Sequence, residues 1–278
     1  QACLRPYQTV ISADSGHINV HETGAIEATG HRILTVPEQN GKLTAEQITR
    51  CCKEHWLDDN PEFAPQPKLV YISFPTEYGT LYSKEELSAI RRVCDENNLF
   101  LFADGARLGY GLEAPGNDVT LADLAACCDV FYIGGTKIGA LLGEAVVIVN
   151  PKLQKDFRYF MKQKGAMLAK GRILGIQFLA LFEDGLYFKL SKHADEMAQI
   201  IRQACAECGF EFLYDSPTNQ QFPIMPDDLI KQLEELYVFS HTKRLDHRRS
   251  AIRICTSWAT RREDVEQLVA DIHKYAGK

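Results

Sequence analysis

The first half of the chain alternates between short apolar runs and stretches with helical periodicity. Mostly apolar runs of strand length occur at residues 68–73, 99–103, 130–133 and 144–149. Strands that are apolar at every position, rather than at alternate positions, are typical of a sheet that helices bury on both faces. We therefore expect an α/β domain with a mainly parallel sheet flanked by helices, in which all of these runs are buried strands.

Two motifs predict where helices begin. Ser83-x-x-Glu86 and Thr260-x-x-Glu263 are capping boxes, in which the hydroxyl and the carboxylate each satisfy a backbone N–H that the first helical turn leaves free. The first box predicts a helix that follows the earliest apolar run. The second predicts the last helix of the chain, which we expect to end near Tyr275.

The pattern changes after Pro151. Helical periodicity follows, with breaks at three glycines, namely Gly165, Gly171 and Gly185. Short strand-like runs at residues 210–214 and 250–255 then alternate with helical stretches. We expect a large α/β domain over residues 1–165, followed by a long helical linker and a smaller α+β domain over residues 166–278.

Composition narrows the class of protein. Apolar residues make up 45% of the 278 residues and charged residues 24%, as in an ordinary globular protein. No apolar run reaches the roughly 18 residues that a membrane helix requires, so we expect no membrane partner. The formal net charge of −6 argues against a nucleic-acid partner, and the basic run at residues 244–249 is interpreted as a solvated loop or helix end.

The nine cysteines are interpreted as mostly reduced thiols of a cytoplasmic protein. The adjacent pairs at residues 51–52 and 127–128 cannot each form a bridge between neighbours without strain. The single C-x-x-C, at residues 205–208, has no second pair at zinc spacing, so we expect no metal site. Because the chain starts with Gln1 rather than Met, any targeting signal would lie on a segment before it.

Two residues that can carry chemistry come at the ends of consecutive predicted strands. Asp104 ends the run at residues 99–103, and Lys137 follows the run at residues 130–133. Ligands of α/β sheets bind beyond the carboxyl ends of the strands, so the two side chains can meet in one pocket. A lysine there can form a Schiff base, and an aspartate can keep a pyridine nitrogen protonated. Taken singly, either residue is better explained as a turn or surface residue, but their order along the chain favours the chemical interpretation.

Through a set of motifs, the chain resembles the threonine aldolase and β-eliminating lyase group of fold-type-I enzymes, which depend on pyridoxal 5′-phosphate (PLP). The motifs are Gly16-His17-Ile18 with Glu22-Thr23-Gly24-Ala25, Asp104-Gly105-Ala106-Arg107, Thr136-Lys137 within GGTKIGALLG, Ser216-Pro217-Thr218-Asn219-Gln220, and Ile252-Arg253-Ile254. The resemblance spans nearly the whole chain. It implies the PLP-dependent transferase-like fold (the type I aminotransferase fold), PLP as cofactor, an amino acid as substrate, and a homodimer or homotetramer.

The resemblance also implies how the cofactor would be held. Lys137 would carry PLP as a Schiff base, and Asp104 would pair with the pyridinium nitrogen. His17 would stack on the ring and assist proton transfer at the substrate side chain. Thr136, next to the lysine, would hydrogen-bond the cofactor phosphate.

On the substrate side, the resemblance implies that Arg107 and Arg253 bind the substrate carboxylate, for which a planar guanidinium group is well suited. An ion pair elsewhere in the protein is the alternative for each arginine. His21 competes with His17, because a strand-like segment would place both rings on one face. Glu22 is left open, either as a group that orients the site or as a helix cap.

The chain departs from the family pattern in several places. The 16 residues before His17 contain no glycine- and serine-rich loop of the kind that holds the PLP phosphate at a helix N-terminus, so we expect a further N-terminal part of the large domain. Glu77 and Tyr78 stand where threonine aldolases have histidine and asparagine, and the lysine segment reads Thr-Lys-Ile in place of Ser-Lys-Gly. These differences bear on the substrate more than on the cofactor.

The sequence thus predicts a PLP-dependent lyase that cleaves the Cα–Cβ bond of a β-hydroxy amino acid, giving glycine and an aldehyde as threonine aldolases do. PLP-dependent β-elimination or transamination of another amino acid is the second hypothesis, because the same lysine, aspartate and arginines serve those reactions. The third is a cofactor-deficient homologue with a non-catalytic role, which the absent phosphate loop favours. Which amino acid is used, and its stereochemistry, stays open.

Overall fold

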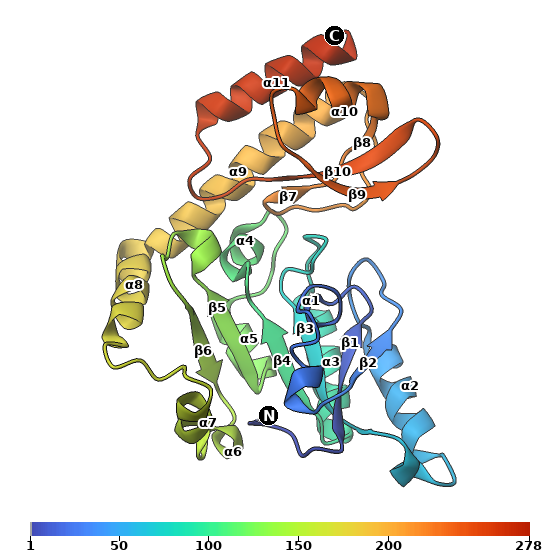
Figure 1. The fold of residues 1–278 in the computed structure, drawn as a ribbon, viewed down its shortest axis with the longest axis vertical. Helices are drawn as coiled ribbons and strands as arrows, with labels where there is room; N and C mark the ends of the chain where they lie inside the picture. The colour runs from blue at the N-terminus through green and yellow to red at the C-terminus, as the bar shows by residue number, and fades with distance from the viewer. Residues whose placement is uncertain (1) are drawn as a thin grey trace.

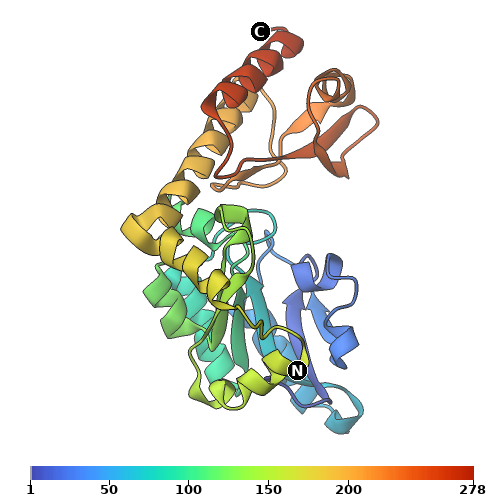
Figure 2. The same ribbon diagram turned by 60° about the vertical axis from the view of Figure 1, so that its left-hand side comes forward.

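The structure is a computed structural model that describes residues 2–278 as two β-sheets connected by a long helix (Figure 1). A six-stranded sheet fills the lower part of the molecule in Figure 1, and a smaller four-stranded sheet lies in the upper part, near the C-terminus. Helix α9 (Leu186–Glu207) runs from one part to the other (Figure 2). Over residues 2–278, no helix combines the length and the apolar character needed to cross a membrane.

The six-stranded sheet has the order β2-β1-β3-β4-β5-β6, and all neighbours pair in parallel except β5 and β6. Its strands are β1 (Gln8–Ala13), β2 (Ile33–Val36), β3 (Gln66–Ser73), β4 (Phe100–Asp104), β5 (Val130–Gly134) and β6 (Glu144–Ile148). The predicted mainly parallel sheet is confirmed, and the four predicted strands of the first half correspond to β3 through β6. Strands β1 and β2 were not expected from the sequence, because they are short or interrupted by polar residues.

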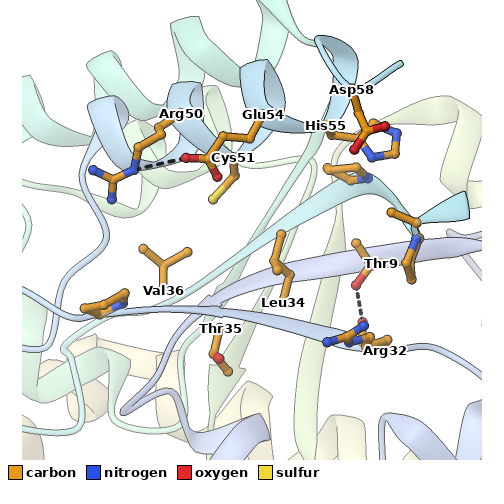
Figure 3. Close-up of a pocket in the computed structure, with 14 residues that line it drawn as sticks. Thr9, Arg32, Leu34, Thr35, Val36, Arg50, Cys51, Glu54, His55 and Asp58 are labelled. Atoms are coloured by element: carbon orange, nitrogen blue, oxygen red, sulfur yellow. Dashed lines mark hydrogen bonds and ion pairs between the residues drawn. The ribbon is translucent and has the colours of Figure 1, made fainter. Parts of the chain in front are cut away.

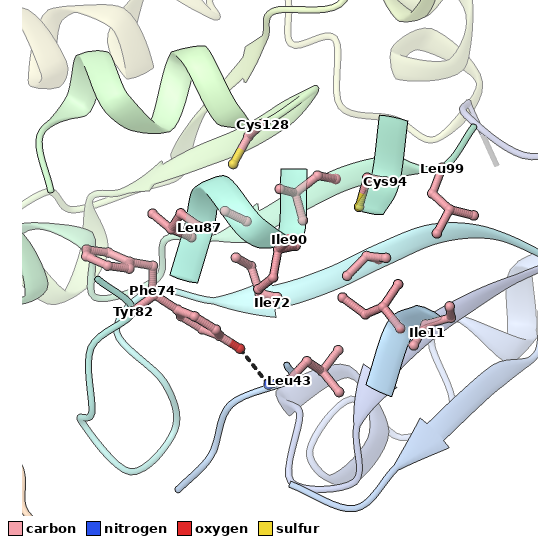
Figure 4. Close-up of a cluster of buried hydrophobic side chains, with 14 of the residues drawn as sticks. Ile11, Leu43, Ile72, Phe74, Tyr82, Leu87, Ile90, Cys94, Leu99 and Cys128 are labelled. Carbon is pink, nitrogen blue, oxygen red and sulfur yellow. Dashed lines mark hydrogen bonds between the residues drawn. The ribbon is translucent and has the colours of Figure 1, made fainter. Parts of the chain in front are cut away.

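Three helices cover one face of this sheet, namely α2 (Ala45–Trp56), α3 (Lys84–Glu96) and α5 (Leu121–Cys127). Alternate strand residues such as Ile72 pack there against Leu87 and Ile90 of α3 (Figure 4). The predicted capping box of α3 is confirmed, because Ser83 and Glu86 each accept the other's backbone N–H. This core fixes the positions of the strands and so of their carboxyl ends.

The opposite face of the sheet carries the other set of alternate residues, among them Leu69, Tyr71 and Phe102. Side chains from the N-terminal segment, including Leu4 and Ile18, pack on part of this face. The segment contains two short helices, α1 (His17–Val20) and η1 (Glu27–Thr29). Phe102 is only half-buried, so this face is less completely covered than the face under the three long helices.

The prediction that residues 144–149 form a buried strand is wrong in part. The strand exists as β6, but it is the antiparallel edge of the sheet, and Val146 is 54% exposed. An apolar run looks the same in sequence whether its own chain covers it or not. Val147 of this strand still packs against the core cluster, so β6 has one face toward the core and one exposed face.

The helical region after Pro151 is confirmed, together with its breaks. It contains α6 (Pro151–Gln154), α7 (Phe157–Gln163), α8 (Arg172–Phe182), η4 (Glu183–Gly185) and α9. Gly165 follows α7 with φ +74°, Gly171 precedes α8, and Gly185 precedes α9 with φ +67°, a conformation that glycine adopts without steric cost. Helix α4 (Leu108–Glu113) packs against α9 and so connects the end of β4 with the long helix.

The small sheet is antiparallel, with β10 pairing β7, β8 and β9. Its elements are β7 (Gln220–Gln221), β8 (Ile224–Pro226), α10 (Asp227–Glu234), β9 (Ser240–Arg244), β10 (Arg249–Cys255) and α11 (Arg262–Ala276). The helices pack with α9 around a second apolar core that includes Met225 and Ile252. The antiparallel sheet with its helices agrees with the smaller α+β domain predicted for the C-terminal part of the chain.

Two local predictions for this part of the chain are wrong. Residues 210–214 form no strand, only an isolated bridge between Phe212 and Pro223. The last helix is capped at Arg261 rather than Thr260, whose hydroxyl instead accepts the backbone N–H of Ser257 at 2.9 Å. The basic run at residues 244–249 closes the β9–β10 hairpin at the surface, which confirms its interpretation as a solvated loop.

Candidate active site

Glycine contacts bring the ends of β4 and β5 together. The Gly134 N–H donates to the Gly105 carbonyl at 2.9 Å. A Cβ on Gly105 would lie 1.9 Å from the Tyr132 carbonyl oxygen, and one on Gly134 would lie 2.4 Å from the Ala106 carbonyl oxygen. Only glycine permits this approach at either position, so the Asp-Gly-Ala-Arg and Gly-Gly-Thr-Lys segments are in direct contact.

A cavity of about 540 Å³ opens beyond these strand ends, between the two sheets. Four of the six predicted site residues line it, namely His17, Arg107, Lys137 and Arg253. The rest of the lining is contributed by Ser15, Val20, His21, Glu77, Tyr78, Phe222, Ser240, His241 and Thr242. Residues far apart in the sequence, from both sheets, therefore meet at one place.

Lys137 lies in the short helix η3 (Thr136–Ile138) that follows β5. The Tyr110 hydroxyl donates to its backbone carbonyl and fixes the turn. Burial, and after it the positive charge of Arg107, lower the pKa of the Lys137 amine, while Asp104 acts in the opposite direction. A larger share of neutral amine is therefore present at a given pH than for an exposed lysine, and the neutral amine is the nucleophilic form.

Asp104 ends β4, as predicted, but its side chain does not itself line the cavity. The hydroxyls of Tyr71 and Tyr132 each donate to one of its carboxylate oxygens. The Ala106 N–H donates to Oδ1 at 2.9 Å. The charge of Asp104 nevertheless acts on the Lys137 amine, so the two side chains share one region of the protein.

His17 begins α1 and is held at two points. Its Nδ1 lies 2.6 Å from the Glu22 carboxylate, and its backbone N–H donates to Glu77 at 2.8 Å. The His21 ring centroid lies 5.2 Å from that of His17. The segment is a helical turn rather than the expected strand, and residues four apart on one turn also face the same way.

Glu77 is a cavity residue to which the sequence analysis gave no catalytic role. Its Oε1 accepts the Ser73 hydroxyl at 2.6 Å as well as the His17 N–H. Burial raises the pKa of the Glu77 carboxyl above its ordinary value. The adjacent Tyr78 ring stacks on Tyr214 at 3.8 Å between centroids, which fixes this wall of the cavity against the small domain.

The two arginines enter the cavity from different parts of the fold. Arg107 directly precedes α4, and Arg253 lies on β10 of the small sheet. Within residues 2–278 neither guanidinium pairs with a carboxylate, whereas Arg244 and Arg249 of the β9–β10 hairpin do. Two unpaired, half-buried cations are well placed to bind an anionic ligand.

Thr136 is not brought into the cavity lining. Its hydroxyl donates to Glu144 of β6 at 3.1 Å, and the Gly135 N–H donates to the same carboxylate at 2.6 Å. The turn is thus closed by a carboxylate, which would repel a phosphate. The cavity offers another hydroxyl, because Ser15 Oγ is buried there without a hydrogen-bond partner in the part of the chain that the structure describes.

The donor set of the cavity fits PLP. PLP carries an aldehyde, an anionic phosphate and a basic ring nitrogen, and the protein offers the Lys137 amine of lowered pKa, the unpartnered Ser15 hydroxyl, and the Asp104 carboxylate at the end of β4. Tyr71, Tyr132 and Glu77 were not predicted as site residues, whereas Glu22 was left open between a group that orients the site and a helix cap, and it lies 2.6 Å from His17 Nδ1. Among these residues, only Glu77 lies at a position where the chain departs from the pattern of threonine aldolases, as its neighbour Tyr78 also does.

A second cavity, of about 360 Å³, lies between α2 and the edge strand β2 (Figure 3). Its lining includes Leu34 and Val36 with the ion pair between Arg50 and Glu54. None of the predicted site residues lines it. The chemistry predicted from the sequence therefore belongs to the cavity at the strand ends.

Comparisons with known proteins agree with this geometry. A family model described as "Beta-eliminating lyase" matches residues 1–227. A low specificity L-threonine aldolase from Pseudomonas sp. is 32% identical over 273 residues, which cover 96% of this chain and 76% of that protein. A structure of Leishmania major threonine aldolase is 42% identical and superposes with a TM-score of 0.95, covering 99% of this chain and 79% of that one.

A Thermus thermophilus aspartate aminotransferase variant, only 14% identical, superposes with a TM-score of 0.67 over 99% of this chain and 71% of that one, and so shares the fold. The mixed sheet, the small antiparallel sheet and the lysine after β5 together define the class of fold-type-I PLP-dependent enzymes. Within that class, the chain belongs to the β-eliminating lyase family. The fold and family implied by the sequence motifs are thereby confirmed.

Proposed function

We propose that this protein is a PLP-dependent lyase that cleaves the Cα–Cβ bond of a β-hydroxy amino acid, giving glycine and an aldehyde, as a threonine aldolase does. The observation that carries the proposal is one cavity that holds a lysine amine of lowered pKa together with two arginines that have no carboxylate partner among the described residues. The likeness to the Pseudomonas and Leishmania threonine aldolases supports this choice of reaction.

When bound, PLP supplies an electron-poor ring that stabilises the negative charge left on the substrate Cα. We assign Lys137 to the covalent attachment of the cofactor and Asp104 to its ring nitrogen. His17, in the same lining, is assigned to the face of the ring. For the phosphate we favour Ser15 over Thr136, since the Ser15 hydroxyl is unpartnered in the described chain and the Thr136 hydroxyl is bound to Glu144.

Arg107 and Arg253 are assigned to the substrate carboxylate. One precedes α4 of the large domain and the other lies on the small sheet, so a carboxylate between them connects the two parts of the molecule. Each guanidinium offers paired N–H donors that match a carboxylate. The absence of an internal ion pair at either arginine, within residues 2–278, supports this assignment.

His17 is assigned to the proton of the substrate β-hydroxyl. The Glu22 carboxylate lies 2.6 Å from Nδ1, so Nε2 is the nitrogen assigned to take the proton. Removal of that proton from the β-hydroxyl oxygen is needed as the Cα–Cβ bond breaks and the aldehyde forms. The position of Glu77 beside His17 places a second acid–base group on the same wall of the cavity.

An assay of products tests the proposal. The full-length protein, loaded with PLP, is incubated with L-threonine or L-allo-threonine, and acetaldehyde and glycine are measured. Serine, cysteine and tyrosine are tested in parallel for pyruvate and ammonia. Acetaldehyde release is the expected result. A PLP-loaded protein that releases only pyruvate and ammonia would be a β-eliminating enzyme, and one that releases neither would refute lyase activity.

We further propose that the protein works as a homodimer or homotetramer. The outer face of β6 and the neighbouring helix α8 expose apolar side chains, among them Val146, Ile176 and Leu179, the last 71% exposed. Exposed apolar patches of this kind commonly mark protein interfaces. Light scattering coupled to size-exclusion chromatography tests the proposal, and a monomer at every concentration would contradict it.

A further inference from the structure

Asp104 is held by two tyrosines that come from the strands on either side of it. The Tyr71 hydroxyl, from β3, donates to Oδ2, and the Tyr132 hydroxyl, from β5, donates to Oδ1. The Ala106 N–H donates to Oδ1 as well. Three neutral donors from three segments therefore fix the plane of the carboxyl group at the end of β4.

The register of the sheet explains why these groups meet. Tyr71 lies opposite Phe102, and Phe102 lies opposite Val130, on three neighbouring strands. Because side chains alternate between faces, Tyr71, Phe102, Asp104 and Tyr132 all stand on the same face of the sheet. The ring centroids of Tyr71 and Phe102 are 5.7 Å apart, and those of Phe102 and Tyr132 are 6.3 Å apart. The aromatic row holds both hydroxyls at the carboxylate.

The charge of Asp104 is not neutralised inside the chain. Within residues 2–278 it forms no ion pair, whereas Asp129, at the start of β5, pairs with Arg91 at 2.8 Å. Burial, and after it the charge of Asp104, raise the pKa of both tyrosine hydroxyls, so Tyr71 and Tyr132 stay protonated and act only as donors. A half-buried carboxylate that accepts hydrogen bonds only from neutral donors is open to a cationic partner.

We propose that Tyr71 and Tyr132 are positioning residues that orient Asp104 and reserve its negative charge for the protonated ring nitrogen of PLP. The inference rests on the proposed cofactor and deepens it, because it assigns two residues of this chain to the strength and protonation of that contact. The tyrosines act through Asp104 and need no contact with cofactor or substrate themselves.

Binding of PLP to the cofactor-free full-length protein tests the proposal. We expect Tyr71→Phe and Tyr132→Phe each to raise the Kd of PLP about tenfold, the scale of one hydrogen bond to a charged group. The bound cofactor should also titrate differently with pH in its visible absorbance. In an Asp104→Asn background, where the charge is gone, the tyrosine substitutions should have little further effect on the Kd.

Tyr82→Phe is the matched control, because Tyr82 is a fully buried tyrosine of the same domain whose hydroxyl accepts the Leu43 N–H and does not contact Asp104 (Figure 4). Unchanged PLP affinity in both tyrosine variants would overturn the proposal. So would equal losses in the wild-type and Asp104→Asn backgrounds, since a merely structural role predicts them. If the PLP effects appear but no aldehyde is released, the inference stands and the proposed reaction fails.

Discussion

The two halves of the cavity are built in different ways. The lysine half is lined by Lys137, which follows β5, and the adjoining strand β4 ends at Asp104; glycine contacts fix the backbone of both strand ends. The arginine half, made by Arg107 and Arg253, is assembled across the two sheets. The lysine half is therefore set by the fold of the large sheet alone, whereas the arginine half also depends on how α9 holds the small domain.

This difference separates two kinds of expected effect. Changes in the lysine half should remove the cofactor and with it all activity. Changes in the arginine half should leave the cofactor in place and weaken substrate binding, which appears mainly in KM. Substitutions that broke this rule would show that the two halves do not act as separate units.

Lys137→Ala should have the largest effect. The loss of the attached amine should reduce activity by more than about a thousandfold and abolish the visible absorbance of the lysine-bound cofactor. Lys68→Ala is the matched control, because burial lowers the pKa of Lys68 as well, but its amine donates to the Asn98 carbonyl away from the cavity. Retained absorbance in the Lys137 variant would refute the assignment of the lysine.

Arg253→Ala should have the second-largest effect on activity. Loss of one carboxylate-binding guanidinium should lower kcat/KM roughly 100-fold, mostly through KM, in line with the ~2–5 kcal/mol that truncating one side of a buried charge pair costs. Arg253→Lys should recover only part of this, because an ammonium lacks the planar pair of donors. Arg249→Ala, on the same strand but paired with Asp246 at the surface, should be nearly silent.

Steady-state kinetics and PLP absorbance separate the outcomes for Arg253. A fall in kcat with loss of the cofactor absorbance would mean that this arginine holds PLP rather than substrate. An unchanged KM would remove it from the substrate site. Either result would also show that the lysine half and the arginine half of the cavity do not have separate roles.

Much of the lysine half was predictable from the sequence because its signals are local. Two apolar runs predict where the strands end. One stops at Asp104-Gly105 and the other stops before the segment Gly134–Lys137, so the residues with reactive side chains follow directly on the predicted strand ends. Tyr71 and Tyr132 could not be predicted in the same way. Their roles depend on which strands are neighbours and in what register, and a single sequence does not contain that information.

The same limit explains where the structure differs from the expected contacts. Thr136 is predicted as a phosphate ligand from its place beside the lysine, and the sequence does not show that the antiparallel pairing of β6 with β5 brings Glu144 to its hydroxyl. Residues 144–149 looked buried because they are apolar, yet β6 is an edge strand. Both differences follow from the place of β6 in the sheet. The sequence pattern shows neither that β6 pairs antiparallel with β5 nor that it lies at the edge of the sheet.

Glu77→Gln should reduce kcat about tenfold, which is part of the rate acceleration that a positioned general acid or base gives. Because burial raises the pKa of the Glu77 carboxyl, its ionised form appears only above the ordinary range of a glutamate, and activity should fall as pH drops through that raised value. The variant should lose this acid limb of the kcat profile. If the limb persists unchanged, the titrating group is another residue and Glu77 only shapes the wall.

Glu22→Gln should have the smallest effect. The carboxylate holds His17 at 2.6 Å, but both side chains are more than a third exposed, at 36% for the histidine and 43% for the glutamate, so water can partly replace the contact. We expect kcat to fall a few-fold, roughly 3–5-fold, with KM and PLP affinity unchanged, because the glutamine still accepts from Nδ1 without stabilising a charged ring. Glu207→Gln is the matched control, since Glu207 pairs with His273 at 3.4 Å and neither residue lines the cavity. Equal losses in both variants would mean that the Glu22 contact has no special part in proton transfer, and His17 would then be reduced to a group that packs against the cofactor.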